Sequence, residues 1–250
     1  MNTTKASPHG TYRKTAVIVG VLFIIGTVAG VLSVVFTGST LTDPNYLVKV
    51  AENQNQVVTA ALLVLTMALA LAMVPLVIFP VLRKHNEILA LGYVVFRGAL
   101  ETVAAIGTVI LWLLLLILSR EYVAAGAPDA SSFQALGAVL LKGADPIGAL
   151  AGIVFGLGAL MLYYVFYQSK LIPRWISVWG FIAILLNLST NILILFDLQS
   201  SFSTANSVMN FPILLQEMVM AVWLIAKGFD PSAIAAGSAK PGTSALLSAA

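Results

Sequence analysis

An uncharged apolar run decides the fold: residues 57–82 read VVTAALLVLTMALALAMVPLVIFPVL, with no charged side chain. A helix of about 20 apolar residues, rising ~1.5 Å per residue, crosses the ~30 Å hydrocarbon core of a bilayer. A run of this length therefore predicts a transmembrane helix.

Five more apolar runs, one before this stretch and four after it, have a similar character. The six predicted spans cover residues 16–37, 57–82, 88–118, 146–168, 175–196 and 205–226. The first run is longer than the ~7–15 apolar residues of a secretory signal, so we expect it to remain as a spanning helix. We predict an all-α integral membrane protein: a six-transmembrane-helix bundle over residues 16–228, after a cytoplasmic N-terminal segment, 1–15. Residues 229–250, rich in Ala, Ser, Gly and Pro, are expected to form a disordered cytoplasmic tail.

The composition of the 250-residue chain agrees with this class. Hydrophobic residues make up 60% of the chain and charged residues 9%, whereas soluble domains carry about 25% charged residues. Intrinsic disorder is excluded because disordered chains are poor in the Leu, Ile, Val and Phe that dominate here. The chain contains no Cys, which excludes disulfides, thiolate nucleophiles and Cys-bound metals.

The loops differ in charge, and this difference predicts the orientation. The loops on the side of the N-terminus contain Lys5, Arg13, Lys14, Arg83, Lys84, Lys170, Arg174, Lys227 and Lys240, with Glu87 and Asp230 as acids. The opposite loops contain Lys49, Arg120 and Lys142 against Asp43, Glu52, Glu121, Asp129, Asp145 and Asp197. Because cytoplasmic loops are enriched in Lys and Arg, both termini are predicted to be cytoplasmic. The net charge of +3 then reflects orientation, and we expect the lipid bilayer rather than nucleic acid as the partner.

Local signals predict where several helices begin and end. The pairs Asp43-Pro44 and Asp145-Pro146 each offer an N-cap followed by Pro at the first helical position. A surface helix is therefore expected after the first pair, and the fourth span after the second, with residues 132–142 as an interfacial segment. Pro173 is expected to start the fifth span, and Lys227-Gly228 to close the sixth.

Three charged side chains fall inside predicted spans: Arg97 and Glu101 in the third, and Glu217 in the sixth. A charge at the centre of a membrane helix costs about 2.5–3.5 kcal/mol on insertion scales, so these side chains are expected to face the bundle interior. Asn187 shares their depth, about 12–18 Å from the cytoplasmic helix ends, and Asn191 lies one turn further out on the same face. We predict one polar layer built from three helices.

The spacing of Arg97 and Glu101, four residues apart, allows an ion pair on one helix face. One base cannot neutralise two acids, so Glu101 or Glu217 is expected to hold or share a proton if the cluster forms. The functional interpretation is a proton-linked or cationic-ligand site at mid-membrane. The alternative is an ionic network that only fixes helix packing.

Prolines and glycines inside the spans predict helix geometry. Kinks are expected at Pro75, Pro80 and Pro212, because proline removes a helical hydrogen bond. Gly148, Gly152 and Gly156 form a small-residue ridge that favours close helix approach. Another helix of this chain, a second copy in a homo-oligomer or another membrane protein are the alternative partners of this ridge.

No sequence signature of a hydrolase, protease or ATPase is present. GxSxG, a phosphate-binding glycine loop and HExxH are absent from the sequence, so these mechanisms have no visible residues. His9 and His85 both fall in predicted cytoplasmic segments, and we expect no metal ion and no cofactor. An intramembrane enzyme is therefore the least favoured function class.

Three segments resemble the bacterial membrane-protein family named domain of unknown function 4386. Residues 79–101 read FPVLRKHNEILALGYVVFRGALE, residues 152–180 read GIVFGLGALMLYYVFYQSKLIPRWISVWG, and residues 211–229 read FPILLQEMVMAVWLIAKGF. The resemblance spans about residues 12–230. It implies a six-helix, multi-pass protein of the bacterial inner (plasma) membrane. It also implies that Arg97, Glu101 and Glu217 belong to the family's pattern, whereas no activity is assigned to the family.

Two hypotheses about function remain open beside the enzyme. In the first, the protein binds or transports a small solute or a proton at the midplane polar cluster. In the second, it is a non-catalytic structural or accessory subunit whose buried charges only fix helix packing. A water-accessible cavity that joins Glu217 to a membrane face favours the first hypothesis, and a dry, fully paired cluster favours the second.

Overall fold

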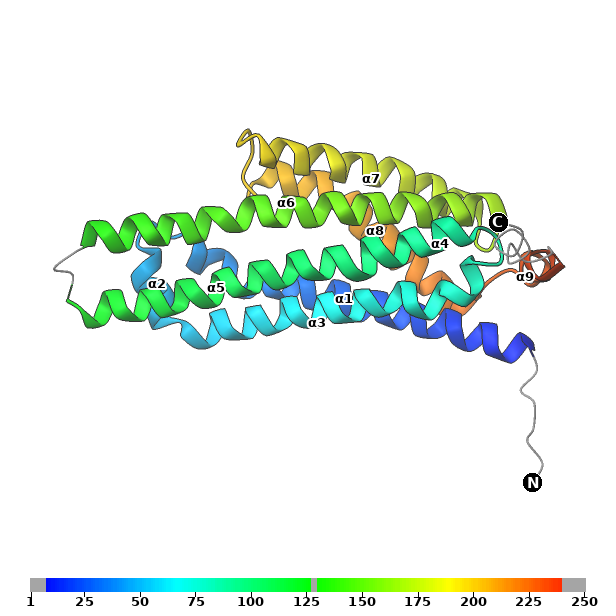
Figure 1. Ribbon diagram of the computed structural model, residues 1–250, viewed down its shortest axis with the longest axis horizontal. Helices are drawn as coiled ribbons and strands as arrows, with labels where there is room; N and C mark the ends of the chain where they lie inside the picture. Colours follow the sequence, from blue (N-terminus) through cyan, green and yellow to red (C-terminus); the bar gives the residue numbers. More distant parts are fainter. Residues whose placement is uncertain (1–7, 127–129, 240–250) are drawn as a thin grey trace, which may run out of the picture.

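The computed structural model describes residues 8–126 and 130–239, and every regular element in these ranges is a helix (Figure 1). The elements are α1 (Pro8–Leu41), α2 (Tyr46–Glu52), α3 (Gln54–Leu82), α4 (Glu87–Tyr93), the π-helix η1 (Val94–Leu100), α5 (Glu101–Ala124), α6 (Ala130–Ser169), α7 (Arg174–Leu195), α8 (Thr204–Ala226) and α9 (Pro231–Ala239).

Six stretches of helix are long and apolar enough to cross a membrane. They are Tyr12–Leu41, Gln54–Leu82, Glu87–Ala124, Ser131–Ser169, Arg174–Leu195 and Thr204–Ala226. The third stretch comprises α4, η1 and α5 in one continuous helix. The predicted all-helical fold with six such helices is confirmed, and it supports a multi-pass membrane protein.

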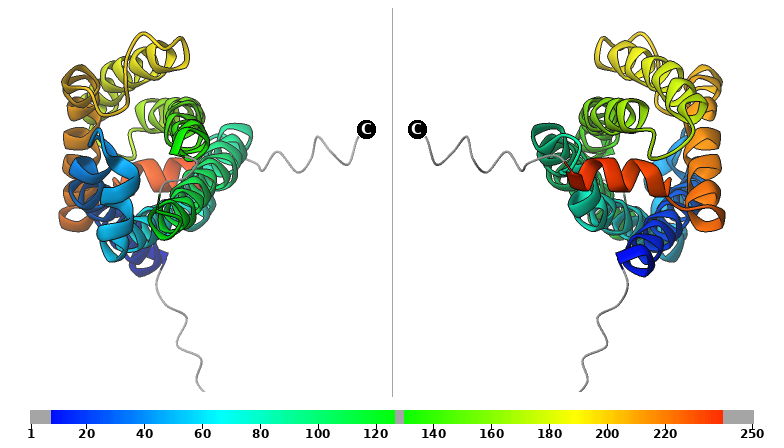
Figure 2. Two further views of the ribbon diagram at one scale, coloured as in Figure 1. Left: turned by 90° about the vertical axis from the view of Figure 1, so that its left-hand side faces the viewer. Right: turned by 90° about the vertical axis from the view of Figure 1, so that its right-hand side faces the viewer.

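The six long helices form a closed ring. Each contacts the next one along the chain, and α8 returns to pack against α1. The end-on views show α8 (orange) beside α1 (blue), with the short helix α9 lying across one end of the bundle (Figure 2). All six helices can therefore contribute side chains to the centre of the ring.

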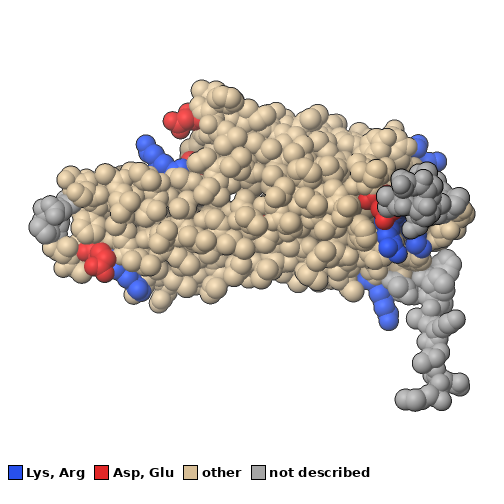
Figure 3. Space-filling model, in the orientation of Figure 1, with Lys and Arg blue, Asp and Glu red and all other residues tan. Residues whose placement is uncertain are grey.

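The surface of the bundle is apolar in the middle and charged toward its ends. Lys and Arg gather at the end where α9 lies (Figure 3). We call this end, with residues 83–86, 170–173 and 227–239, the basic end, and the end with α2 and residues 196–203 the opposite end. Large apolar side chains such as Val35 and Val103 are exposed on the outer faces between them. Soluble proteins rarely expose apolar patches of this extent, whereas lipid-facing surfaces require them.

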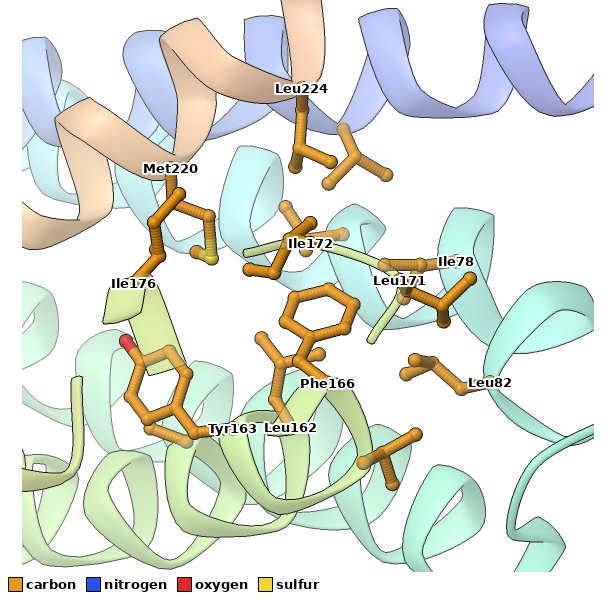
Figure 4. Close-up of a cluster of buried hydrophobic side chains, with 14 of the residues drawn as sticks. Ile78, Leu82, Leu162, Tyr163, Phe166, Leu171, Ile172, Ile176, Met220 and Leu224 are labelled. Carbon is orange, nitrogen blue, oxygen red and sulfur yellow. The ribbon is translucent and has the colours of Figure 1, made fainter. Parts of the chain in front are cut away.

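The main hydrophobic core lies toward the basic end. It contains most of the largest fully buried side chains, several of which are shown in Figure 4: Ile78, Leu82, Phe166, Leu171, Ile172, Ile176 and Met220. A second cluster joins α2, α3 and α5 near the opposite end and includes Leu47, Val57 and Trp112. The short loop 170–173 carries Leu171 and Ile172 into the main core, so the packing fixes the connection between α6 and α7.

The predicted helix start at Asp43-Pro44 is wrong by two residues, because these residues form a turn. The Oδ1 atom of Asp43 accepts a hydrogen bond from the backbone N–H of Asn45 at 2.7 Å. The backbone carbonyl of Asp43 accepts from the N–H of Tyr46 at 3.0 Å. An Asp side chain that bonds two residues ahead makes a turn rather than a cap, and α2 begins at Tyr46.

The fourth span does not begin at Pro146, because α6 is a single helix of 40 residues that also contains the predicted interfacial segment 132–142. Gly137 lets α6 approach α2, since a Cβ atom there would lie 2.8 Å from the hydroxyl oxygen of Tyr46. Phe133 packs against Tyr122 of α5, with ring centroids 5.8 Å apart. These contacts extend the helix beyond the proline, whose missing backbone hydrogen bond membrane helices tolerate.

The chain after the sixth span is helical where we predicted disorder over residues 229–250. Pro231–Ala239 forms α9, and residues 240–250 lie outside the described ranges. The Oδ1 atom of Asp230 caps α9 by accepting hydrogen bonds from the backbone N–H groups of Ser232 (2.9 Å) and Ala233 (3.1 Å). The Ser232 hydroxyl also donates a hydrogen bond to this oxygen. The hydrogen bonds to Asp230, above all the one from this hydroxyl, lower the pKa of its carboxyl.

Two predicted helix boundaries are confirmed. Pro173 is the N-cap of α7, and Lys227 is the C-cap of α8. Gly228 follows with φ +77°, a left-handed conformation that glycine adopts without strain. The N–H groups of Lys227 and Gly228 both donate to the carbonyl of Trp223, at 2.7 and 3.2 Å, so the last turn of the helix is capped.

Candidate functional site

Arg97, Glu101 and Glu217 meet inside the ring. The Nη1 atom of Arg97 lies 3.0 Å from both carboxylate oxygens of Glu101. Its Nη2 atom lies 3.1 Å from Oε1 of Glu217. The exposed fractions of the three side chains are 3%, 17% and 12%. With all three groups ionised, the cluster carries one positive and two negative charges, a formal sum of −1.

Arg97 lies in the π-helical turn η1, a feature that the sequence analysis missed. At the end of η1 the backbone N–H of Glu101 donates to the carbonyl of Phe96, five residues earlier. Gly158 of α6 allows η1 to come close, because a Cβ atom there would lie 3.1 Å from the backbone nitrogen of Arg97. Single π-helical turns inside α-helices are frequent at functional sites.

Uncharged residues hold the cluster in place. The Arg97 guanidinium lies over the ring of Phe155, 4.3 Å from its centroid, in a favourable cation–π contact. Gln216, the neighbour of Glu217, accepts a hydrogen bond from the hydroxyl of Tyr163 at 2.8 Å. Its Nε2 atom donates to a backbone carbonyl of α7 at 3.1 Å. These bonds tie α8 to α6 and α7 and thereby fix the position of Glu217.

A wide, open cavity of about 310 Å³ lies beside the cluster; all six long helices contribute to its wall, in which Val31 and Val34 of α1 are exposed. We call it the central cavity. Its polar wall consists of Thr27, Arg97, Glu101, Asn187, Asn210 and Glu217, and its apolar wall includes Val31, Met67, Leu71, Phe155 and Ile213. The cluster is therefore not enclosed by packed side chains on every side.

A second cavity of about 240 Å³ adjoins the central cavity at Val34, which lines both. On α1 its wall continues from Val34 through Thr37 to Leu41, toward the opposite end of the bundle. Asp145 of α6, which we predicted to cap a helix, lies in this wall instead. The two cavities follow one another along α1 from the middle of the bundle toward the opposite end.

Asn187 and Asn191, which we predicted to share one polar layer with the charged residues, form hydrogen bonds with groups outside the ion-pair cluster. The Nδ2 atom of Asn187 donates to Oδ1 of Asn210 at 2.7 Å. The Nδ2 atom of Asn191 donates to the backbone carbonyl of Asn187 at 2.7 Å. Asn187 lines the central cavity, whereas Asn191 packs against Gly152 of α6. Asn210 was missed, although Asn206 and Asn210 repeat the four-residue spacing of Asn187 and Asn191.

The glycine ridge of α6 is used within the chain at two of its three positions. Gly156 lies against Leu188 of α7, where a Cβ atom would be 2.5 Å from a methyl carbon of that side chain. Gly152 lies equally close to Asn191, whereas Gly148 has no atom within 4 Å of the position of a Cβ atom. Docking of a second protein through this ridge stays a prediction.

The three prolines predicted to kink the spans all lie inside helices, Pro75 and Pro80 in α3 and Pro212 in α8. Pro75 supports the site directly. Its ring lies against Gly98 of η1, where a Cβ atom would be 3.4 Å from the Cγ atom of the proline. A bend at each proline stays a prediction.

A larger groove, of about 540 Å³, lies at the basic end between residues 170–174 and 227–231. Lys170, Arg174 and Lys227 line it. It is separate from the buried ion pairs. The smaller central cavity combines buried charges with unpaired polar atoms, and for this reason it is the candidate functional site.

A comparison with known protein families identifies the family of this chain. The family model described as Domain of unknown function (DUF4386) matches residues 18–228. Comparisons with curated proteins and with solved structures find no match. The matched range contains the ion-pair cluster and both cavities. Because the match covers most of the 250-residue chain, the protein belongs to the domain of unknown function 4386 family.

Proposed function

We propose that this protein binds a small solute or a proton at the Arg97–Glu101–Glu217 cluster and moves it across the membrane. The observation that carries the proposal is the central cavity, which reaches the cluster and is lined by all six long helices. Its volume of about 310 Å³ lies at the lower end of the ~300–1,000 Å³ that small-molecule sites occupy.

The charge balance of the cluster supports reversible binding. Arg97 is shared by two carboxylates, so one negative charge is unbalanced when both acids are ionised. A proton or a bound cation neutralises this excess. The surrounding low dielectric makes such a neutralisation more favourable than it is in water.

The proposal includes an orientation, with the basic end and both termini on the cytoplasmic side of a bacterial plasma membrane. The gathering of Lys and Arg at the end where α9 lies supports it (Figure 3), because cytoplasmic loops are enriched in these residues. A phosphatase reporter, active only outside the cytoplasm, is expected to be inactive when fused to the C-terminus. An active fusion overturns this orientation.

Cysteine labelling tests whether water reaches the central cavity. The chain contains no Cys, so Thr27→Cys places a single thiol in the cavity wall. Val28→Cys is the matched control, because the adjacent side chain is 50% exposed on the outer surface, where lipid would cover it. A water-soluble methanethiosulfonate reagent is expected to modify the Thr27→Cys protein in membranes and to leave the Val28→Cys protein unmodified. A folded but unreactive Thr27→Cys protein means a dry cavity and overturns the proposal.

The second candidate function is a structural or accessory subunit, and the complete pairing of Arg97 favours it. The guanidinium bonds to carboxylates on α5 and α8, so the same groups could serve only to join helices. Glu217→Gln separates the candidates, since it retains the shape of the side chain and removes its charge. A structural role predicts lower thermal stability in detergent. The proposed binding role predicts that the variant folds and that proton uptake on acidification falls by about one proton per chain.

A further inference from the structure

We propose that the solute is a small primary ammonium cation, a short alkylamine in its protonated form, whose N–H groups bind Glu217 and Asn187 in the central cavity. This inference rests on the proposed function and names the chemical class of its ligand. Three features support it. They are the direction of the hydrogen bonds along the side-chain amides of Asn206, Asn210 and Asn187, the unused hydrogen-bond acceptors beside the central cavity, and the apolar part of the cavity wall.

Two backbone carbonyls fix the direction of the amide chain. The Nδ2 atom of Asn206 donates to the carbonyl of Ser201 at 2.7 Å. The Nδ2 atom of Asn210 donates to the carbonyl of Asn206 at 3.0 Å. A backbone carbonyl only accepts hydrogen bonds, so neither amide can be turned around. Asn210 therefore presents its oxygen to Asn187, which must donate its Nδ2 group, at 2.7 Å.

This direction leaves Asn187 with an unused acceptor. Its side chain is 6% exposed, and its Oδ1 atom is buried without a hydrogen-bond donor from the described residues. An unpaired buried carbonyl costs about 1–3 kcal/mol. Asn187 lines the central cavity, and a ligand in this cavity whose N–H group reaches the Oδ1 atom would remove this cost.

The ion-pair cluster adds a second acceptor and a negative charge. Arg97 uses Nη1 for Glu101 and Nη2 for Oε1 of Glu217. The other oxygen of Glu217, Oε2, takes part in none of these bonds. The cavity thus offers acceptors and a formal charge of −1. One monovalent cation neutralises that charge, whereas an anion or a zwitterion leaves a net negative charge in the membrane.

The remainder of the wall fits a hydrocarbon group. Val31, Leu71 and Ile213 face the central cavity, whose volume of about 310 Å³ far exceeds the ~30 Å³ share of one water molecule. A bare metal ion would leave most of this space without contacts. A short alkyl chain can contact these apolar side chains, and each buried CH₂ group favours binding by about 0.8 kcal/mol.

Isothermal titration calorimetry of the full chain in detergent tests the inference, with n-butylammonium as the probe. Three comparison compounds each lack at least one property of this probe. Tetramethylammonium retains the charge but has no N–H groups. 1-Butanol retains the alkyl chain but has no charge. Na⁺ has the charge but neither N–H groups nor an alkyl chain. We expect n-butylammonium to bind one site per chain, and the other three to bind at least about tenfold more weakly.

Variants connect this binding to the named atoms. Asn187→Leu removes the free acceptor, and Glu217→Gln removes the charge. Each is expected to weaken n-butylammonium binding by about tenfold to a hundredfold. Ser189→Ala is the matched control on α7, because this exposed hydroxyl bonds only to the carbonyl of Leu185. If Asn187→Leu fails to fold, the Glu217→Gln variant and the comparison with tetramethylammonium still test the assignment of the ligand as a primary ammonium cation.

The outcomes separate the ligand class from the proposed function. Equal affinities for tetramethylammonium and n-butylammonium, or unchanged binding by folded Asn187→Leu and Glu217→Gln proteins, overturn the amine assignment. No binding of n-butylammonium to a protein whose Thr27→Cys variant is labelled overturns the ligand class and leaves the proposed function in place. An unlabelled Thr27→Cys protein overturns both.

Discussion

The two ends of the bundle differ in how closely α1 fits its neighbours. Toward the basic end, Gly20 of α1 lies so close to α8 that a Cβ atom would be 2.6 Å from the carbonyl oxygen of Ala221. Toward the opposite end, Gly38 of α1 and Gly148 of α6 have no atom within 4 Å of such a position. α1 is therefore tightly packed toward one end and less closely packed toward the other, whereas the close fit of α6 is interrupted at Gly148 and resumes at Gly137 against α2.

Hydrogen bonds join helices toward both ends of the bundle, but they differ in kind. At the basic end, the guanidinium of Arg13 donates to the carbonyls of Leu224 (3.0 Å) and Ile225 (2.5 Å) and so joins α1 to the last turn of α8. Carbonyls in the last turn of a helix lack partners within it and favour a cation. Toward the other end of α8, the side chains of Asn210 and Asn206 accept hydrogen bonds from Asn187 (2.7 Å) and Thr190 (3.0 Å) of α7, and Asn210 lines the central cavity. A charged side chain thus joins α8 to α1 at the basic end, whereas uncharged amides and a hydroxyl join α8 to α7 beside the central cavity.

The largest expected effect on stability comes from removing Arg97, the buried base that lies between the two ends of the bundle. Arg97→Met leaves two buried carboxylates without a partner, which typically destabilises a protein by about 3–5 kcal/mol. We expect a large drop in the thermal unfolding midpoint in detergent. Arg83→Met is the control, because Arg83 is exposed and its guanidinium lies over the ring of Phe79 in a cation–π contact, outside the ion-pair cluster. Adding Glu101→Gln and Glu217→Gln to Arg97→Met should restore much of the loss, and an Arg97→Met protein as stable as the wild type contradicts this account.

A matched pair of glycine substitutions on α1 sharpens the comparison of the two ends. Gly20→Ala forces a methyl group against the carbonyl of Ala221, and overpacking of this kind costs about 1–3 kcal/mol. Gly38→Ala meets no atom within 4 Å and gains helix propensity, so it should be neutral or stabilising by up to about 1 kcal/mol. Thermal unfolding of both variants measures the difference. Equal destabilisation at the two positions would show that the fit of α1 is uniform.

The smallest expected effect concerns the helix that covers the basic end. The pKa of Asp230 is lowered, chiefly by the hydrogen bond from Ser232, so the ionised carboxylate supports the cap of α9. A lowered pKa contributes stability that is present above the ordinary Asp value of about 3.9 and is lost as the pH falls through the lower folded value. Amide exchange in residues 231–239 should therefore be faster at pH 3 than at pH 6. Ser232→Ala should reduce this dependence, and a pH-independent exchange pattern, after correction for intrinsic rates, would refute it.

Hydropathy and local spacing predicted much of the fold and part of the site. Long apolar runs predict helices directly, because the bilayer thickness sets their length. The pairing of Arg97 with Glu101 follows from their four-residue spacing, and the approach of Glu217 follows from the cost of leaving a charge in lipid. These features depend on one helix, or on one helix and the membrane.

The features that were missed depend on contacts between helices. The π-helical turn at Arg97 has no sequence signal of its own, and the close approach at Gly158 is visible only in the folded bundle. The helix start predicted at Pro146 was wrong because contacts of α6 with α2 and α5 outweigh a local capping signal. The direction of the amide chain depends on backbone carbonyls that only the structure positions.

The single unbalanced charge of the cluster has an electrical consequence. A transmembrane voltage acts on a charge with about 2.3 kcal/mol per 100 mV when the charge crosses the whole membrane, and with proportionally less over part of it. With both carboxylates ionised and no cation bound, the groups around Arg97 sum to −1, and the field acts on them. With a monovalent cation or a proton bound, the sum is zero. The membrane potential thus distinguishes the two forms of the site and acts on only one of them.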